Sequence, residues 1–173
     1  MKKLPKRILI VGASGTGKNF LGDKLSKLTG LKVYDLDDVY FIRKFDKPRP
    51  KRLRKGLADK MAGRKKWIIV GLHIFEWASS AFEKADLIIL LNERFLTEAI
   101  RIFRRYLRRN GERKTMESLL GTLKLIRDDY MCFHHHKGKG KLVTKDIKSK
   151  YAHKTVVLSS KKEVERFLKQ FKA

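Results

Sequence analysis

The chain has 173 residues, and 43 Lys and Arg against 18 Asp and Glu give it a formal net charge of +25 at pH 7. With 42% apolar and 10% aromatic residues, it can build one hydrophobic core, which excludes a disordered polybasic tail. A single cysteine excludes an intramolecular disulfide, and no apolar run reaches the roughly 18 residues of a membrane span. We therefore expect one soluble, cytoplasmic domain over residues 1–173 that makes no contact with membranes.

Short apolar runs alternate with segments of helical periodicity, a pattern typical of stacked βα units. The predicted strands are Arg7–Val11, Leu31–Tyr34, Trp67–Val70, Leu87–Leu91 and Thr155–Leu158. The predicted helices are about Gly17–Leu28, Arg52–Ala62, Ile74–Phe82, Leu96–Arg108, Met116–Met131 and Lys161–Phe171. Strands that are apolar throughout need cover on both faces, which favours a parallel, doubly wound α/β sheet.

Two segments interrupt this alternation. Lys44–Arg54 carries two prolines among basic residues and is predicted to be a loop that enters a helix. Cys132–His153 has many lysines and no clear period, which indicates a mobile basic insertion before the last strand. Within it, Cys132 and the histidines at 134–136 offer metal-ligating atoms, but adjacent histidines cannot converge on one ion without distant ligands. As donors beside lysines, they could instead contact phosphate.

The most informative residues follow the first strand, where RILIVGASGTGKN nearly matches the Walker A pattern and leads into an amphipathic helix. Glycines allow a tight turn that aims backbone N–H groups inward, and the helix adds its positive N-terminus. Lys18 is expected to reach the β- and γ-phosphates. The predicted nucleotide-binding residues are Gly12, Ser14, Gly15, Thr16, Gly17, Lys18 and Asn19. The alternative is an ordinary glycine-rich βα turn.

One position of this loop departs from the pattern. Ser or Thr normally follows the lysine and ligates Mg²⁺ through its hydroxyl, whereas this chain has Asn19. An amide oxygen can still contact a hydrated Mg²⁺. ATP and Mg²⁺ are therefore the expected ligands, with Asn19 as a weak contact to the metal.

Beyond the loop, the sequence resembles the adenylate-kinase-like small P-loop kinases, and most of all the DNA topology modulation proteins, over nearly its whole length. Their Leu-Asp pair and aromatic segment after the second strand correspond to YDLDDVYF. Their third strand, a Trp followed by two apolar residues, Asp and Gly, corresponds to Trp67–Gly71, with Val70 in place of the aspartate. Ala85 and Asp86 precede the fourth strand, which ends at Asn92 instead of aspartate, and TVVLSSKKEVERFL matches the final strand and helix.

The resemblance implies a three-layer P-loop nucleoside triphosphate hydrolase fold with five parallel strands and a basic lid at about residues 104–115. It also implies transfer of the γ-phosphoryl group of ATP to a nucleotide or another hydroxyl- or phosphate-bearing acceptor. The carboxylates left near the expected cleft are Asp35, Asp37 and Asp38. An acidic residue after the second strand contacts acceptor or metal in related kinases, so Asp37 is predicted to orient or deprotonate the acceptor, or to hold Mg²⁺ through water. Alternatively, Asp37 caps a helix that starts at about Val39.

The helix near residues 96–108 carries apolar residues at spacings of four, three and four, which predict one buried stripe of Leu96, Ile100, Phe103 and Leu107. Arg104 and Arg108 lie on the shoulder of that stripe, and Arg101 lies slightly further round. Since kinases of this kind neutralise the transferred phosphoryl group with lid arginines, Arg104 and Arg108 are predicted catalytic residues. The alternative is a solvated basic face.

The net charge exceeds what one nucleotide needs. Clusters at Lys44–Lys55, Arg101–Lys114 and Lys137–Lys154 could follow the phosphate backbone of RNA or DNA, or could simply make a soluble surface that binds polyanions non-specifically. Two functions therefore stay open. One is an ATP-dependent kinase or weak ATPase, and the other is a nucleic-acid-binding protein whose P-loop binds nucleotide with little catalysis.

Overall fold

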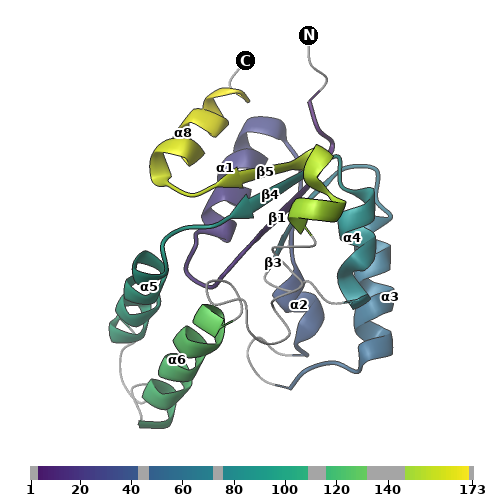
Figure 1. Cartoon of the computed structure of the whole chain (residues 1–173). Coiled ribbons are helices and arrows are strands. Elements are labelled where there is room, and N and C mark those ends of the chain that lie inside the picture. Colours follow the sequence, from purple (N-terminus) through teal and green to yellow (C-terminus); the bar gives the residue numbers. More distant parts are fainter. Residues whose placement is uncertain (1–3, 43–46, 72–75, 109–115, 132–146, 172–173) are drawn as a thin grey trace.

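A parallel β-sheet forms the centre of the computed structural model, which describes residues 4–42, 47–71, 76–108, 116–131 and 147–171. Its five strands stand in the order β2-β3-β1-β4-β5, and every pairing is parallel (Figure 1). The strands are β1 (Arg7–Gly12), β2 (Val33–Asp35), β3 (Trp67–Gly71), β4 (Leu87–Leu91) and β5 (Thr155–Leu158). The predicted α/β class, the parallel sheet and its five strands are confirmed.

The helices begin and end close to the predicted residues. They are α1 (Lys18–Thr29), α2 (Leu36–Tyr40), α3 (Lys51–Ala62), α4 (Ser79–Lys84), α5 (Phe95–Leu107), α6 (Met116–Asp129) and α8 (Lys161–Lys169), with 3₁₀ turns at Glu76–Ala78 and Ala152–Lys154. The predicted helix at Ile74–Phe82 is thus a 3₁₀ turn followed by α4, and its first two residues lie outside the described part. No helix in the described ranges is long and apolar enough to cross a bilayer.

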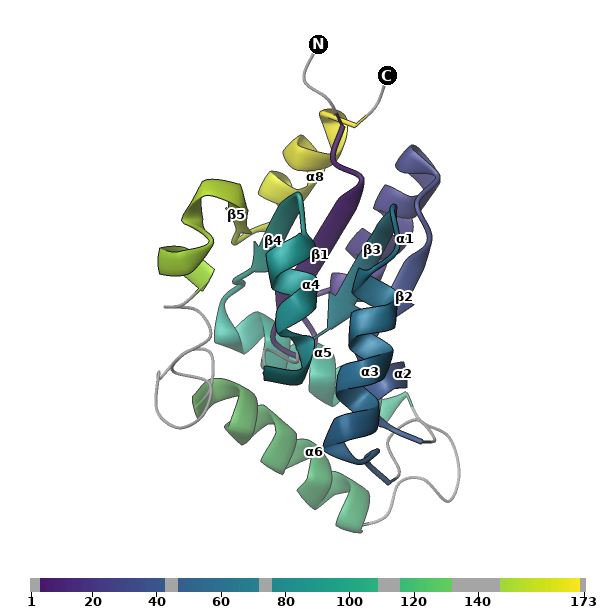
Figure 2. The ribbon, with the colours of Figure 1, turned by 90° about the vertical axis from the view of Figure 1, so that its right-hand side faces the viewer.

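The central strand β1 is buried on both faces because its side chains alternate between two cores. Ile8 and Ile10 pack with residues of α1 and α8 on one face. Leu9 and Val11 pack with residues of α2, α3 and α4 on the other. Figure 2 shows α3 and α4 in front of the sheet, with α1 and α8 behind it. This period of two explains why the strand is apolar throughout and why its carboxyl end is held rigidly.

The second half of the predicted insertion has regular structure. Residues 147–150 are helical, Ile147 is 1% exposed in the core, and the Tyr151 ring lies 5.8 Å from that of Phe82. The prediction of a loop through His153 was wrong here because two apolar residues one helical turn apart, among lysines, are enough to dock the segment. The part at 132–146, with Cys132 and His134–His136, lies outside the described residues.

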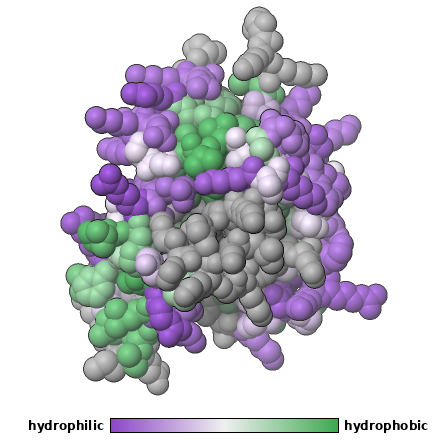
Figure 3. Space-filling view, viewed as in Figure 1, coloured by the Kyte–Doolittle hydropathy of each residue, from purple (hydrophilic) through white to green (hydrophobic). Residues whose placement is uncertain are grey.

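The predicted buried stripe of α5 was also wrong. Exposed fractions are 72% for Leu96, 51% for Ile100 and 50% for Leu107, against 1% for Glu98 and 3% for Ile102. Figure 3 shows apolar side chains gathered at the lower left of the molecule, where Figure 1 places α5. The helix faces the protein with its other side because that side packs on the loop after β1. A Cβ placed on Gly15 would meet Ile102 Cγ1 at 3.2 Å.

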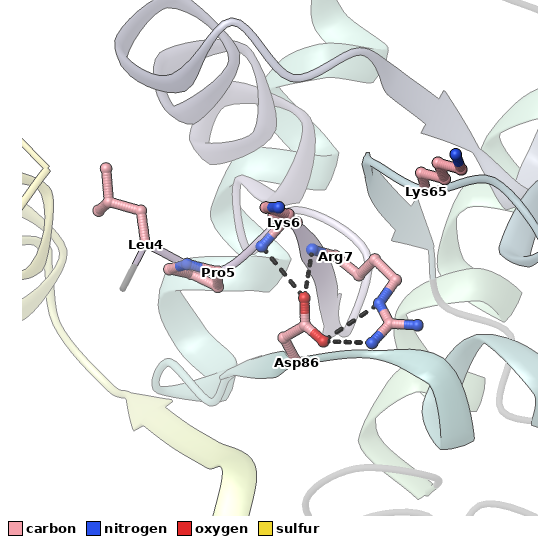
Figure 4. A pocket seen from close by; sticks show the side chains of 6 residues that line it. All are labelled: Leu4, Pro5, Lys6, Arg7, Lys65 and Asp86. Atoms are coloured by element: carbon pink, nitrogen blue, oxygen red, sulfur yellow. Dashed lines mark hydrogen bonds and ion pairs between the residues drawn. The ribbon is translucent and has the colours of Figure 1, made fainter. Parts of the chain in front are cut away.

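Asp86 ties the amino ends of β1 and β4 together, at the edge of the sheet opposite the loop after β1. Its carboxylate accepts hydrogen bonds from the backbone amides of Lys6 (3.1 Å) and Arg7 (2.9 Å) and from the Arg7 guanidinium (Figure 4). These residues line a hollow of 340 Å³ with Leu4, Pro5 and Lys65. Burial raises the pKa of Asp86, but the bonds from Arg7 and Lys6 outweigh it, so the pKa lies below its usual value.

The packing of α5 leads to a stability prediction. Ile102→Ala is expected to lower the free energy of unfolding by about 2–4 kcal/mol, because it empties a buried site. The control Leu96→Ala should change it by less than about 0.5 kcal/mol, since that side chain is mostly in solvent. Urea denaturation of both variants measures the difference. A larger loss of unfolding free energy for Leu96→Ala than for Ile102→Ala would contradict this packing and support the buried stripe that the periodicity predicts.

The lowered pKa of Asp86 predicts how stability depends on pH. A group whose folded pKa lies below its unfolded value of 3.8 stabilises the fold above that value, and the contribution is lost as pH falls through the folded pKa. Because the pair is about one-third exposed, at 38% and 32%, screening limits the effect. Asp86→Asn is expected to cost about 1 kcal/mol at pH 7 and less at pH 3. Guanidinium denaturation at both pH values checks this, with the exposed Asp23→Asn as control.

Candidate phosphate-binding site

The loop that connects β1 to α1 forms a tight turn with its glycines in a left-handed conformation. Gly15 has φ 80° and Gly17 has φ 88°, a region that favours glycine. Gly17 is the N-cap of α1, and no side chain caps the helix there. The positive end of α1 therefore faces the hollow of the turn, as an anion-binding loop requires.

Close packing against neighbouring strands and helices fixes the course of this loop. A Cβ on Gly12 would lie 2.7 Å from the carbonyl oxygen of Leu91 in β4, and a Cβ on Gly15 would lie 3.0 Å from that of Glu98 in α5. The Thr16 hydroxyl donates to the Ala13 carbonyl at 2.8 Å across the turn. Glycine is thus needed at 12 for close approach and at 15 for both approach and conformation.

Lys18 lies at the start of α1 and folds back over the turn. Its Nζ donates to the Ala13 carbonyl at 2.7 Å. Burial lowers the pKa of Lys18, while the charges of Asp129, Asp37, Asp35 and Glu98 act to raise it. The charges of four carboxylates therefore act on one lysine, although the chain carries 43 basic residues and only 18 acidic ones.

The residue after Lys18 is held beside the end of β2. Asn19 Nδ2 donates to Asp35 Oδ2 at 3.2 Å, and Asp35 Oδ1 accepts from the amide of Asp37 at 2.9 Å. Asp35 is therefore the N-cap of α2, which starts at Leu36. The alternative in which Asp37 caps a helix from about Val39 was wrong, because the cap lies two residues earlier.

The side-chain oxygens of Asn19, Asp35 and Asp37 are of the kind that bind Mg²⁺ in proteins. The ion usually takes one or two carboxylates, several waters and the phosphates of its substrate rather than a complete protein cage. No group of three His, Cys, Asp or Glu within the described ranges is arranged to hold a metal. Asn19, Asp35 and Asp37 are the residues that could complete the shell of a nucleotide-bound ion.

A second carboxylate reaches the loop from α6. Asp129, which ends α6 and is 4% exposed, accepts a hydrogen bond from the Ser14 amide at 2.9 Å through Oδ2. Its burial raises the pKa, against the lowering influence of the Ser14 hydrogen bonds and the Lys18 charge. This contact crosses 115 positions of sequence, and no local pattern in the sequence indicated it.

An arginine of α5 also touches the loop. Arg101 donates from Nη1 to the Gly15 carbonyl at 3.1 Å, and the same guanidinium pairs with Glu93. Successive residues of a helix are rotated by about 100° around its axis. Measured around the axis from the buried Glu98, Arg101 lies at about −60° and Arg104 at about −120°, so Arg104 is further from the buried face. Arg104 and Arg108 are exposed, and their catalytic role stays a prediction.

Comparison with known proteins places this geometry in a structural class. The chain is similar to shikimate kinase from Bacteroides thetaiotaomicron, with a TM-score of 0.57, 13% identity and 96% of each chain covered. For shikimate kinase from Acinetobacter baumannii in complex with shikimate, the TM-score is 0.59, with 15% identity and 98% of this chain and 91% of that one covered. The chain has the fold of the small P-loop kinases. The chain is also similar to a gluconokinase from Sinorhizobium meliloti 1021, with a TM-score of 0.58, 15% identity, and 98% of this chain and 91% of that one covered.

Sequence comparison is less extensive. No family model matches the chain. A protein of Bacillus subtilis strain 168, the uncharacterized protein YqaC, is 37% identical over 90 residues, which are 51% of this chain and 49% of that protein. The match thus spans about half the length of this curated relative. The resemblance to DNA topology modulation proteins in particular stays a prediction.

The small P-loop kinase fold brings most of the predicted site together at the carboxyl edge of the sheet. Ser14, Thr16, Gly17 and Lys18 form one turn, with Asn19 and Asp37 joined through Asp35. Sequence reasoning missed Asp129 and the contact of Arg101 with the loop, while the role of Arg104 and Arg108 stays a prediction. Only one local signal pointed to Arg101, namely that it shares a helical face with Glu98.

Proposed function

We propose that this chain is an ATP-dependent phosphotransferase that moves the γ-phosphoryl group to an acceptor hydroxyl. The observation that carries the proposal is the turn from Gly12 to Lys18, which joins a helix N-terminus to a partly buried ammonium group. Such a turn cradles the phosphates of a nucleotide. The fold shared with shikimate kinase and gluconokinase supports the same function.

The residues around the turn supply the parts that phosphoryl transfer needs. Lys18 would bind the β- and γ-phosphates once its contact with Ala13 is exchanged for them, and Mg²⁺ held by Asn19 and Asp35 would neutralise their charge. Asp37 would orient the acceptor and accept its proton as the oxygen–phosphorus bond forms and ADP leaves. Arg101, which already contacts the loop, would balance charge on the transferred group.

The acceptor is proposed only as a class. The acceptor hydroxyl beside Asp37 would belong to a nucleoside, a nucleotide or a small hydroxylated acid. Shikimate, the ligand of one solved neighbour, is included among the acceptors to be tried. ATP turnover with and without each acceptor tests the proposal. Absence of both ATP binding and transfer would remove it.

A second function is favoured by the distribution of charge. Carboxylates gather around Lys18, whereas α3 and α5 expose many cations, which are Lys51, Arg52, Lys55, Lys60, Arg101, Arg104, Arg105 and Arg108. We propose that this outer surface binds RNA or DNA through the phosphate backbone. Its affinity would fall steeply as salt rises.

The Lys18→Ala substitution separates these two functions. It should weaken ATP binding about 10- to 100-fold, because a charge-assisted contact is lost, and leave binding of single- and double-stranded RNA and DNA unchanged. Calorimetry with ATP and fluorescence anisotropy at rising salt give the two readouts. Lys24→Ala, which removes the same charge from an exposed position of α1, is the control. Equal effects of both variants on ATP would contradict the assigned role of Lys18.

The contact of Arg101 with the loop predicts a difference between two arginines of one helix. Arg101→Ala should lower kcat about 100-fold with a smaller change in KM, since its charge acts mainly on the transferred group. Arg104→Ala, with the same loss of charge, should change kcat less than about threefold. Steady-state kinetics with the best acceptor decides the question. A larger effect of Arg104→Ala would support the original assignment to Arg104 and Arg108.

A further inference from the structure

Asp129, at the end of α6, reaches the phosphate loop with its carboxylate, and the proposed reaction does not use it. Its Oδ2 accepts the Ser14 amide at 2.9 Å, and the side chain is almost fully buried. The neighbouring Asp128 is 50% exposed and pairs with Arg127 at 3.0 Å. Two adjacent residues with the same charge therefore occupy different environments, which makes the contact of Asp129 specific to its position.

The carboxylate occupies a position suited to a phosphate oxygen. Backbone amides of such a loop bind anions because several N–H groups converge there with the positive end of a helix. A carboxylate oxygen is a charged acceptor much like a phosphate oxygen, and it takes one of these amides here. Lys18, the loop's cation, is meanwhile bonded to the Ala13 carbonyl, and of the carboxylate charges around it that of Asp129 has the strongest influence.

We propose that Asp129 is an internal ligand of the phosphate loop that a bound nucleotide displaces, and that it thereby sets an affinity threshold that polyphosphates exceed and single phosphate groups do not. This inference rests on the proposed function, because it requires a nucleotide that binds at Ser14 and Lys18. A carboxylate and a phosphate cannot share one amide, since like charges in contact repel.

The affinity of an incoming anion depends on the bonds that it forms in the loop, set against the contact between Ser14 and Asp129 that every anion must break. A single phosphate group that enters the loop replaces one anionic acceptor with another, so its binding is favoured only slightly. A triphosphate offers several oxygens to the remaining amides and to Lys18, and these bonds outweigh the loss of the bond between Ser14 and Asp129. For a chain with a net charge of +25, this exchange would keep inorganic phosphate and phosphodiester backbones out of the nucleotide site.

Displacement of Asp129 is helped by the environment of its carboxylate. Burial removes water from the charged group, which raises its pKa. The bonds with Ser14 and the attraction to Lys18 lower the pKa, but they do not fully offset the effect of burial. Return of the charged carboxylate to water on displacement would recover this cost of desolvation.

The experiment compares Asp129→Asn with Asp128→Asn and the wild-type chain. Calorimetry measures the Kd of ATP with and without Mg²⁺, of pyrophosphate and of inorganic phosphate. Asp129→Asn is expected to bind ATP about tenfold more tightly, because the competent state no longer has to be freed from its internal ligand. The affinities for pyrophosphate and inorganic phosphate should rise by a similar factor, because all these anions displace the same internal ligand. Asp128→Asn, with the same change in charge, should alter each Kd less than about twofold.

A second measurement uses the wild-type chain and does not depend on how a variant folds. Carboxyl groups are labelled with a carbodiimide and an amine, and labelling is quantified by mass spectrometry. Asp129 should be protected in the nucleotide-free protein and labelled several-fold faster at saturating ATP, whereas Asp128 should not change. Unchanged or slower labelling of Asp129 with ATP would overturn the proposal.

The binding data distinguish failure of this inference from failure of the proposed function. If the wild-type chain binds ATP and Asp129→Asn binds it no more tightly, the inference is wrong and the function stands. Weaker binding of ATP by Asp129→Asn only when Mg²⁺ is present would make Asp129 a metal ligand instead. If Asp129→Asn and Asp128→Asn bind ATP more tightly by the same factor, the effect is one of net charge and the inference is wrong. If neither variant nor the wild-type chain binds nucleotide, the function and the inference are both overturned.

Discussion

An anion-binding turn at the carboxyl end of a buried strand is the constraint on which the rest of this molecule depends. β1 is paired on both sides and packed on both faces, so its end cannot move. The two positive φ angles that follow reverse the chain within a few residues and point the start of α1 into the hollow. Because N–H groups without helical partners converge there, a charged acceptor must complete the turn. Asp129 does so in part, and phosphate is the proposed ligand.

Charge is distributed so that the small number of carboxylates are concentrated where they have the greatest effect. Four of them influence Lys18, one of these, Asp35, also caps α2 by accepting from the Asp37 amide, and Asp86 holds β1 to β4 at the opposite edge. The exposed faces of α3 and α5 are left basic. Carboxylates around one lysine, with basic helix faces outside them, suit the proposed binding of a metal and a polyanionic substrate.

The placement of α5 shows how tertiary packing can override an amphipathic pattern. The helix has a clean apolar stripe, yet Glu98 and Ile102 face inward because the loop at Gly15 leaves room only for that side. The rotation brings Arg101 to the loop. The apolar stripe is left in solvent over the described part of the chain, and a mutation there is expected to act on the surface of the helix, with no effect on the core.

Local chemistry in the sequence determined the strands of the sheet, the order of the elements along the chain and the glycine-rich turn that is proposed to bind phosphate. Continuous apolar runs, a glycine-rich turn and a following amphipathic helix are short-range signals, and the five strands form within a few residues of their expected bounds, whereas the helical residues 147–150 were expected to be loop. Asn19 and Asp37 were recognisable for the same reason, since they lie next to those elements. Contacts between distant segments were decided only by the tertiary structure. The bond between Ser14 and Asp129 spans 115 positions, and the rotation of α5 depends on which face the loop accepts, so neither follows from spacing along one helix.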